Sequence, residues 1–520
     1  MTIRQPEEHP EPRLLDVRLV VHTHWDREWY RPFPQFRTRL VALLDAVLDG
    51  DGGVPFLLDG QSVILEDYLE LRPERSAEVS SALRQGAIEA GPWYVLADAL
   101  IPCGEGLVRN LLAGRRVLRS LRAEAPDVLY CPDSFGHPAS LPAIASGFGF
   151  ESIIVWRGYG GASHPPGDTA RWAAPDESSA ILYHLTPDGY EFGSHLPPES
   201  DAARERWDAM RQVIEPRAVT GLVLLPVGAD HHAPQANLEA SIAALAQAAA
   251  PHVIARSPLA QFGSELVERA ARVALPEVSG ELRDSYGYAW TLQGTLGARA
   301  ALKRRYARVE SLLLRDVEPW AGLARRRDDV DRRAAVRTAW KPLLLCQAHD
   351  TLCGCSVDEV ASAMDARLRD ARSAGEEVRD AALMALVGHD GNEARRRPGA
   401  WSPVALVRNP APRTRSGVAE IDVDLVLDDA PVGPASAGIE PRVHRTGPIS
   451  IGHRPVPLQE LARTRTFARE EASRHYPWNR LVERRRVLAW VTGVPPYGMV
   501  TLPIEGKRRR ATVPPASVSA

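Results

Sequence analysis

Residues 17–30 read VRLVVHTHWDREWY, an apolar run followed at once by a dense cluster of polar and aromatic side chains. The run Val17–Val21 is typical of a buried strand. Side chains of an extended segment alternate between its two sides, so His24 and Asp26 are expected to point the same way. Imidazole nitrogens and carboxylate oxygens are ordinary zinc ligands. A polar strand end with a satisfied core histidine is the alternative, but the density of aromatic and charged residues favours a site.

The pattern of a strand followed by a helix recurs through the first half of the chain. Apolar runs and helical spacings alternate, with strands expected at 54–58, 128–131, 152–156, 181–183 and 221–227 and helices at 38–48, 62–71, 79–85, 107–121, 141–148 and 237–249. This alternation predicts a mainly parallel sheet covered by helices, with its chemistry at the carboxyl ends of the strands. The residues expected just after a strand are His22, His24, Asp133, Arg157 and Asp230.

The second half of the chain has a different composition. Helical spacing at 296–317, 334–346 and 356–387 predicts a helical bundle, and Val-, Pro- and Gly-rich segments after Trp401 predict a β-sandwich. The predicted domains are a β/α-barrel-like domain at 14–275, a helical bundle at 276–388, a linker at 389–402, a β-sandwich at 403–506 and a disordered tail at 507–520. The expected fold class is thus α/β, then α, then β.

Three further segments carry candidate chemistry. Asp133 lies in PDSFGH at 132–137, where an acid before a glycine turn suits a loop that approaches a ligand, although a simple turn around Asp is the alternative. Asp230 lies in GADHH at 228–232, where the alternative to a catalytic acid is an ordinary polar loop. His349 and Asp350 follow a helical run. The alternative to a metal ligand is a histidine near the C-terminus of a helix, where the helix dipole favours it. The sequence alone leaves open whether these segments meet.

Charge and composition exclude several classes of function. The net charge is −3 and the basic runs are short, so nucleic-acid binding is not expected. No apolar run reaches the roughly 18 residues needed to cross a membrane, and the N-terminus lacks the apolar core of a secretory signal, so a cytoplasmic location is expected. Five cysteines do not make a disulfide framework. Cys353-Gly-Cys355 could form a metal clip, but free thiols are favoured because a second spaced pair is missing.

Seven ordered motifs together resemble the α-mannosidases of glycoside hydrolase family 38, in the bacterial branch that includes mannosylglycerate hydrolases. The motifs are HTHWDREWY at 22–30, GPWYVLAD at 91–98, GEGLVRNLL at 104–112, PDSFGH at 132–137, VWRG at 155–158, LPVGAD at 225–230 and AHDTLCGCSVDEV at 348–360. The resemblance implies a β/α domain, a helical bundle that completes a metal site, and C-terminal β-sandwiches. It also implies a zinc-dependent retaining α-mannosidase that forms a covalent glycosyl-aspartate.

The resemblance assigns roles to residues of this chain. One zinc ion would be held by His24, Asp26, Asp133 and His349, with His22 outside the ligand set. Asp133 would also be the nucleophile and Asp230 the acid/base. Trp29, Arg157 and Asp350 would bind the sugar or surround the nucleophile. Retaining glycosidases place their two carboxyls about 5 Å apart, so Asp133 and Asp230 are expected to face each other across a sugar-sized gap.

Other functions remain open at this point. Family members continue through further β domains, whereas this chain ends soon after residue 505, so a weakly active or inactive mannose-binding remnant is one alternative. A mannosylglycerate hydrolase is another, and a zinc-dependent deacetylase, which uses similar ligands, is a third. The expected substrate is an α-mannoside or a mannosylglycerate-like small molecule. A homo-oligomer or a separately encoded C-terminal domain is an open possibility for partners.

Overall fold

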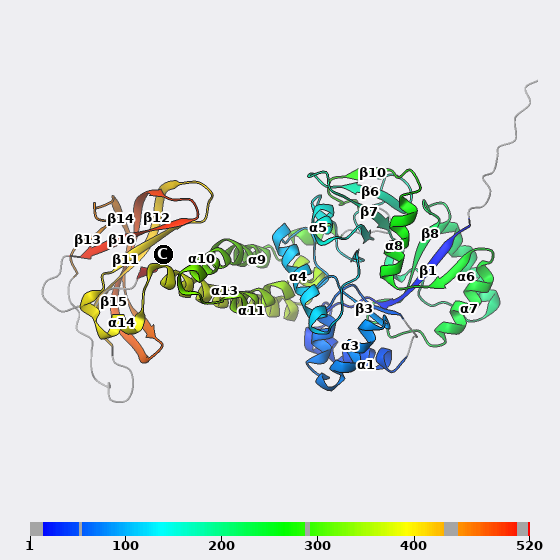
Figure 1. The fold of residues 1–520 in the computed structure, drawn as a ribbon, viewed down its shortest axis with the longest axis horizontal. Helices are drawn as coiled ribbons and strands as arrows, with labels where there is room; N and C mark the ends of the chain where they lie inside the picture. The colour runs from blue at the N-terminus through cyan, green and yellow to red at the C-terminus, as the bar shows by residue number, and fades with distance from the viewer. Residues whose placement is uncertain (1–13, 51–54, 286–291, 431–445, 507–517, 520) are drawn as a thin grey trace, which may run out of the picture. The chain divides into compact units, whose positions relative to one another are not determined.

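The computed structural model describes residues 14–50, 55–285, 292–430, 446–506 and 518–519. The described chain is mixed α/β and forms two compact units (Figure 1). The first unit runs to residue 311 and includes 337–374, and the second comprises 312–336 and the chain from 375 onward. This division passes through the helical region expected at 276–388. The domain boundaries drawn from the sequence therefore stay predictions.

The first unit contains, within the described residues, two five-stranded sheets. The strand expected at Val17–Val21 is confirmed as β1 (Asp16–Thr23), which is buried along most of its length. It pairs in parallel with β8 (Leu222–Val227), β9 (Val253–Arg256) and β2 (Phe56–Leu58). The β3 strand (Ile88–Ala90) then pairs with β2, also in parallel. Residue 54, the expected start of the second strand, lies outside the described residues.

The second sheet is also mainly parallel, as predicted. The β4 strand (Val128–Cys131) pairs with β5 (Ser152–Val155), and β5 pairs with β7 (Ser179–His184), all in parallel. The β6 strand (Thr169–Ala173) runs antiparallel to β7, and β10 (Glu277–Ser279) is parallel to β6. One buried cluster includes Val20 and Leu224 from the first sheet and Tyr130 and Ile154 from the second. The two sheets therefore share a core.

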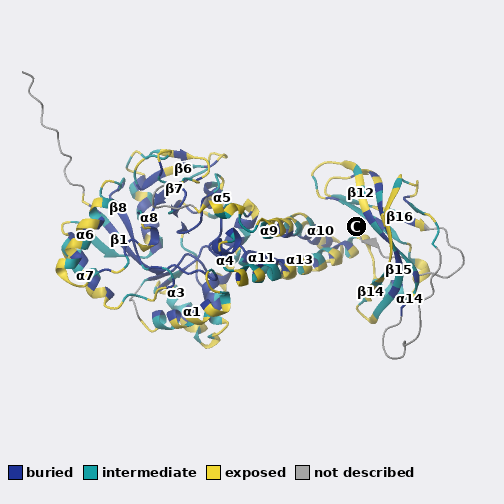
Figure 2. Ribbon diagram, turned by 180° about the vertical axis from the view of Figure 1, so that it is seen from behind, coloured by how far each residue is buried: buried dark blue, intermediate teal, exposed yellow. Residues whose placement is uncertain are grey.

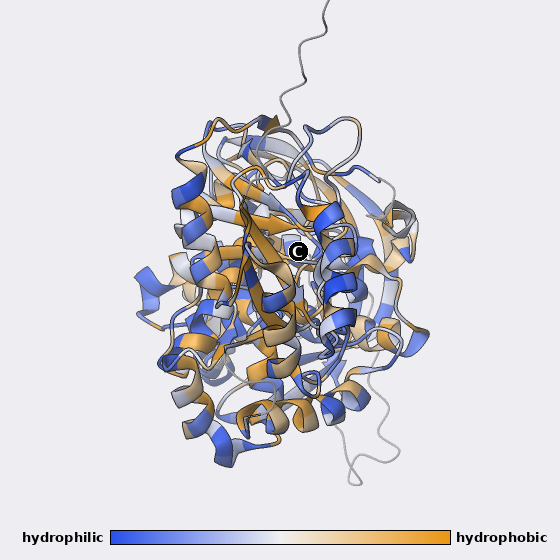
Figure 3. Cartoon of the chain, turned by 90° about the vertical axis from the view of Figure 1, so that its right-hand side faces the viewer, coloured by the Kyte–Doolittle hydropathy of each residue, from blue (hydrophilic) through white to orange (hydrophobic). Residues whose placement is uncertain are grey.

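Amphipathic helices cover these sheets. They are α1 (Phe33–Leu48), α2 (Val63–Leu69), α3 (Ser76–Arg84), α4 (Gly104–Ser120), α5 (Leu141–Phe148), α6 (Ser200–Ile214), α7 (Leu238–Ala249) and α8 (Leu259–Ala270). Figure 1 shows α6 and α7 beside β1 and β8. In Figure 2 the strands are largely buried and the outer helix faces exposed, and in Figure 3 the helices carry both hydrophilic and hydrophobic residues. None of the described helices is long and apolar enough to cross a membrane.

The α4 helix approaches the core closely through one glycine. A Cβ at Gly114 would lie 2.2 Å from the carbonyl oxygen of Pro92, so no larger residue fits there without movement. Leu107, Leu111 and Leu118 line the same buried face of the helix. The helix thereby packs against the segment after Gly91, which carries Trp93 and leads to the Leu96 carbonyl beside the site.

Helices occur where the sequence predicts them at 296–317, 334–346 and 356–387, with more elements than predicted, whereas β10 lies at 277–279. The helices are α9 (Ala300–Leu312), α10 (Glu318–Asp328), α11 (Arg333–Leu345), α12 (His349–Cys353) and α13 (Asp358–Val387). The α10 and α12 helices lie outside the predicted helical segments. His349, which was weighed as the residue of a helix C-terminus, instead begins α12.

The second unit contains two mainly antiparallel sheets around one core, as a β-sandwich requires. Within the described residues, β11 (Val404–Asn409), β16 (Gly498–Gly506) and β13 (Ile449–Ile451) form one sheet, and β14 (Leu458–Ala472), β15 (His475–Val494), β12 (Arg415–Asp429) and β17 (Val518–Ser519) form the other. Ala405 and Ile504 of the first sheet pack in the same cluster as Ile421 and Val487 of the second.

Three expectations for this region differ from the structure in whole or in part. The predicted linker at 389–402 contains the helix α14 (Gly391–Arg396), whose N-terminus is capped by the Asp390 side chain. Residues 507–517 and 520 of the predicted disordered tail lie outside the described residues, whereas Val518–Ser519 pair with β12. The long β14–β15 hairpin was predicted only over 487–491.

Candidate metal and active site

The candidate residues of the first unit follow the carboxyl ends of its strands. His24 and Asp26 come directly after β1, and Asp133 comes two residues after β4. Arg157 follows β5, and Asp230 follows β8 and forms a parallel bridge with His24. β1 and β8 belong to the first sheet and β4 and β5 to the second, and the shared core of the two sheets brings the carboxyl ends of these strands together.

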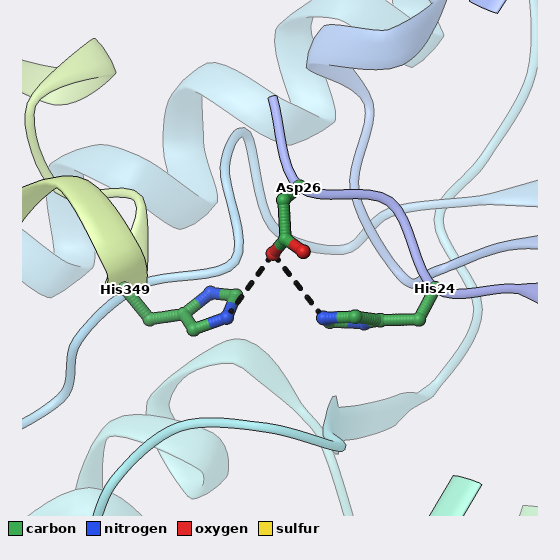
Figure 4. A group of neighbouring side chains, drawn as sticks. All are labelled: His24, Asp26 and His349. Atoms are coloured by element: carbon green, nitrogen blue, oxygen red, sulfur yellow. Dashed lines mark ion pairs between the residues drawn. The ribbon is translucent and has the colours of Figure 1, made fainter. Parts of the chain in front are cut away.

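Four side chains converge here. His24, Asp26 and Asp133 follow strands, whereas His349 begins α12, and three of the four are drawn in Figure 4. Asp26 Oδ1 lies 3.3 Å from His24 Nε2 and 3.3 Å from His349 Nε2. Asp133 Oδ2 lies 3.2 Å from His349 Nε2 and 3.9 Å from His24 Nε2. All four residues are buried. The structure thus places close together the two histidines and two carboxylates that the family resemblance implies as zinc ligands.

The donor atoms at the centre of this cluster contact one another but form no hydrogen bonds with the rest of the described chain. His24 Nε2, Asp26 Oδ1 and His349 Nε2 are buried and have no hydrogen-bond partner among the residues that the structure describes. Leaving a buried polar atom unsatisfied costs about 1–3 kcal/mol. One donor atom from each of these three residues lies within 4.8 Å of the others. Two imidazole nitrogens and carboxylate oxygens are a donor set suited to a divalent cation such as zinc.

The electrostatics of the cluster favour a cation at its centre. Burial opposes a charge on His349, but Asp350 and Asp133 outweigh it and raise the pKa of His349 to about 9. Burial would raise the pKa of Asp133, but Arg157 and His349 hold that pKa below its usual range. Without a metal, the carboxylates therefore draw protons onto the histidines. A bound cation would replace that positive charge.

Asp59 is a residue of the site that the sequence did not single out. It is fully buried directly after β2, and its Oδ1 lies 2.9 Å from His24 Nδ1. Its Oδ2 accepts hydrogen bonds from the Trp25 backbone N–H at 3.0 Å and from Gln61 Nε2 at 2.9 Å. A carboxylate on one ring nitrogen fixes the tautomer that leaves the other nitrogen free for a metal. The available signal was its place after an apolar strand, the same place that Asp133 occupies.

Asp133 is held on its other side by Arg157. Arg157 Nε donates to Asp133 Oδ1 at 2.5 Å, so the two oxygens of Asp133 face different groups. The guanidinium of Arg157 lies 4.1 Å from the ring centre of Trp156. A stacked, charged partner of this kind keeps a carboxylate ionised and fixes its orientation.

Asp230 lies at the border of the cluster and is half-buried. Its Oδ1 has no hydrogen-bond partner among the described residues. The next residue, His231, accepts a hydrogen bond from the Asp26 backbone N–H through Nε2 at 3.2 Å. Tyr190 stacks on His24 with ring centres 4.4 Å apart and lies within electrostatic range of Asp230 and Asp133. His231 and Tyr190 were not identified from the sequence.

The remaining candidates lie around this centre. Asp350 is buried, with Oδ2 3.8 Å from His349 Nε2. Trp29 is half-buried, its ring meets Tyr30 edge-on, and its carbonyl accepts the Val357 backbone N–H at 3.1 Å. His22 lies outside the metal cluster, since its Nε2 is bonded to the Tyr190 carbonyl at 2.8 Å. No interaction joins Trp29 directly to the four central residues in the part of the chain that the structure describes.

Comparison with known proteins gives two family matches. The model for the glycosyl hydrolases family 38 N-terminal domain matches residues 14–280, and the model for the alpha mannosidase middle domain matches residues 290–386. The described fold also resembles the crystal structure of an alpha-mannosidase from Enterococcus faecalis V583. That likeness has a TM-score of 0.84 at 24% identity and covers 95% of this chain and 56% of the other.

Two relatives agree with these matches. A protein of Halalkalibacterium halodurans named "Putative mannosylglycerate hydrolase" is 31% identical over 73% of this chain and 44% of its own length. Alpha-mannosidase 2C1 of Mus musculus is 25% identical over 74% of this chain and 37% of its own length. The chain thus spans less than half the length of these relatives. Because the first family model alone covers more than half of the chain, the protein belongs to glycoside hydrolase family 38.

Proposed function

We propose that this protein is a zinc-dependent retaining α-mannosidase that cleaves terminal α-mannosidic bonds through a covalent glycosyl-aspartate. The observation that carries the proposal is the convergence of His24 Nε2, Asp26 Oδ1 and His349 Nε2 as buried atoms without hydrogen-bond partners in the described chain, with Asp133 Oδ2 beside them. Membership of the family supports the reaction class. When bound by His24, Asp26, Asp133 and His349, zinc would supply a Lewis acid that orients the sugar.

The side chains have complementary roles in the proposed reaction. Arg157 keeps Asp133 ionised and turned toward the cluster, which suits a nucleophile. Asp133 would attack the anomeric carbon while Asp230 donates its proton to the departing oxygen. In the second step Asp230 would take a proton from water, which attacks the same carbon and releases Asp133. Asp350, buried beside His349, would accept hydrogen bonds from sugar hydroxyls, and Trp29 would offer an apolar face to the ring.

The test combines metal content with turnover. The purified full chain is assayed for bound zinc and for hydrolysis of p-nitrophenyl α-mannoside, and Asp133 is probed with an activated fluoro-mannoside that traps the covalent intermediate. We expect one zinc per chain at the cluster, turnover, and an adduct on Asp133 detected by peptide mass spectrometry. Zinc binding without turnover, even with any separately encoded C-terminal partner added, would instead indicate a mannose-binding remnant. Turnover without an adduct would exclude the covalent route.

A mannosylglycerate hydrolase is the second candidate. The observation that favours it is the 31% identity to a relative carrying that name. A substrate panel that includes α-mannosides and mannosylglycerate separates the two functions, because a mannosylglycerate hydrolase should turn over its own substrate with much the higher kcat/KM.

The domain organisation, location, substrate and partners belong to the same proposal. The family matches at 14–280 and 290–386 support a β/α-barrel-like catalytic domain at 14–275 and a helical bundle at 276–388 that completes the metal site. A cytoplasmic location, an α-mannoside or mannosylglycerate-like substrate, and either a homo-oligomer or a separately encoded C-terminal domain are the remaining parts of the proposal. Gel filtration with light scattering tests the oligomer.

A further inference from the structure

The segment after α12 places two thiols side by side near the site. Gly354 adopts a positive φ of 85°, which reverses the chain between Cys353 and Cys355. The two Sγ atoms lie 3.3 Å apart, and both cysteines are free. Cys353 is buried, whereas Cys355 is exposed and gives the pair access to solvent. A covalent disulfide needs about 2.05 Å between its sulfurs, so the pair is a dithiol.

A carboxylate completes the group. Cys355 Sγ lies 2.9 Å from Asp350 Oδ1, within hydrogen-bonding distance. One donor atom from each of Asp350, Cys353 and Cys355 lies within 4.8 Å of the others. Thiolate sulfur with carboxylate oxygen is a donor set for zinc and for other thiophilic divalent cations. None of the four residues of the first cluster belongs to this group.

The surrounding residues fix the loop that carries these donors. Lys303 Nζ donates to the Cys353 carbonyl at 2.8 Å, and Arg299 Nε donates to the Gly354 carbonyl at 3.1 Å. Ser356 Oγ donates to the Asp350 carbonyl at 2.8 Å. Pre-organised donors lose little conformational entropy when they bind a ligand. Two thiolates, one carboxylate and a dication sum to one negative charge, which the nearby Lys303 ammonium balances.

We propose that Asp350, Cys353 and Cys355 form a second cation site, for a thiophilic divalent cation such as cadmium or excess zinc. Asp350 has one oxygen toward Cys355 and the other toward His349, so a cation on the thiols takes this carboxylate away from the sugar. This consequence rests on the proposed function, in which Asp350 binds substrate. Cation binding at the second site therefore weakens substrate binding while the first cluster stays intact.

Cadmium titration of the full chain tests the site. The protein is first loaded with one equivalent of zinc, and the ultraviolet charge-transfer absorption of cadmium–thiolate bonds is followed as cadmium is added. We expect one equivalent of cadmium to produce this absorption in the unmodified chain. Cadmium that replaces zinc in the first cluster, whose donors are nitrogen and oxygen, produces none.

Serine variants show which cysteines produce the cadmium–thiolate absorption. Cys353→Ser and Cys355→Ser should each lose it, and Cys103→Ser, which changes an exposed cysteine outside the group, should keep it. The site is excluded if the unmodified chain shows no absorption while a thiol reagent finds both cysteines reduced. It is also excluded if the absorption survives in both serine variants of the pair. A disulfide, found as missing thiols that return on reduction, would contradict a resting dithiol.

The coupling to Asp350 has a separate readout. Cadmium should raise the KM for p-nitrophenyl α-mannoside in the unmodified chain and leave it unchanged in Cys355→Ser. An unchanged KM at saturating cadmium contradicts the coupling. If the chain turns over no mannoside, the proposed function fails, but the absorption experiment still decides the cation site because it needs no catalysis.

Discussion

Asp59 Oδ1 lies 2.9 Å from His24 Nδ1, and both side chains are buried. This contact leaves His24 Nε2 to face the cluster formed with Asp26 and His349. Gln61 extends the support to the other histidine, because its Nε2 donates to Asp59 and its Oε1 accepts the Leu96 backbone N–H, while the Leu96 carbonyl accepts the backbone N–H of His349. Both histidines of the proposed metal site are thus braced by one buried network.

Asp59→Asn should weaken zinc binding by about 10–100-fold, the usual cost of losing a partner behind a metal ligand. The amide nitrogen of Asn would face a donor in either orientation, since Asp59 accepts from Trp25 and Gln61 on one oxygen and contacts His24 on the other. Competition with a chromophoric chelator measures the affinity. The matched control is Asp168→Asn, which should keep full affinity for zinc. Asp168 is a buried carboxylate directly before β6 that accepts hydrogen bonds from Thr169 Oγ1 and the Val219 backbone N–H. Equal affinities in the two variants would contradict the bracing role.

Asp230→Asn should slow hydrolysis according to the leaving group. General acid catalysis contributes about 10²–10⁴-fold, so kcat/KM for methyl α-mannoside should fall by that factor. A 2,4-dinitrophenyl leaving group departs without a proton, and its kcat/KM should fall much less. Steady-state kinetics with both substrates tests this, and a uniform loss for both would assign Asp230 a role other than proton donor.

Acid should destabilise the fold through buried neutral histidines. Burial lowers the pKa of His137 to about 4 and of His184 to about 3, against about 6.5 when unfolded. Between those values the unfolded chain binds protons that the folded chain does not, so stability falls as the pH drops below about 6.5. For His137 alone the loss between pH 8 and pH 5 is about 2 kcal/mol.

Urea denaturation at the two pH values measures this loss. His137→Asn cannot take up the proton and should show a smaller difference between pH 8 and pH 5 than the unmodified chain. His475→Asn, at an exposed position on β15, should show the unmodified difference. If the change in unfolding free energy between pH 8 and pH 5 is the same in all three proteins, His137 does not contribute to the loss of stability in acid.

Buried Glu28 and half-buried Arg367 form an ion pair that ties the segment after β1 to α13. Arg367 Nη2 donates to Glu28 Oε2 at 2.6 Å, and Thr351 Oγ1 donates to Glu28 Oε1 at 2.8 Å. Removing one partner strands a buried charge, so Arg367→Met should cost about 3 kcal/mol of unfolding free energy. The double change Glu28→Gln with Arg367→Met should cost less than the single change.

Chemical denaturation of these variants gives the comparison. Arg463→Met breaks an exposed pair with Glu460 and should cost less than about 1 kcal/mol. If Arg367→Met costs no more than Arg463→Met, the pair of Glu28 and Arg367 does not hold the site together.

The sequence predicts the elements of the site better than their contacts. β1 and β4 are predictable because their runs are mostly apolar, with only Arg18 interrupting Val17–Val21, and such runs suit largely buried strands. The strand ends also mark Asp133 and Asp230. The ring centres of His349 and His24 lie 5.5 Å apart although 325 positions separate them in the sequence. This depends on tertiary packing, which no local pattern encodes, and only the family resemblance indicated it.

Local signals were missed where they were weak or mixed. Asp59 precedes Gly60 and has a positive φ of 49°, so its sequence is typical of a turn. It does not indicate a carboxylate that supports a metal-binding histidine. In the β14–β15 hairpin, arginine alternates with threonine at 463–466 and three arginines stand in a row at 484–486. Much of β14 is exposed, so the sequence there lacks the alternation of apolar and polar residues that marks a strand. The α14 helix is short, and its capping residue Asp390 lies in a stretch that otherwise suits a linker.

An anomalous difference map at the zinc edge, from crystals of the full chain with one equivalent of zinc, tests the central claim most directly. The account predicts one peak within about 2.0–2.2 Å of His24 Nε2, Asp26 Oδ1, Asp133 Oδ2 and His349 Nε2. A map without a peak there, or with the zinc held by other residues, would contradict it.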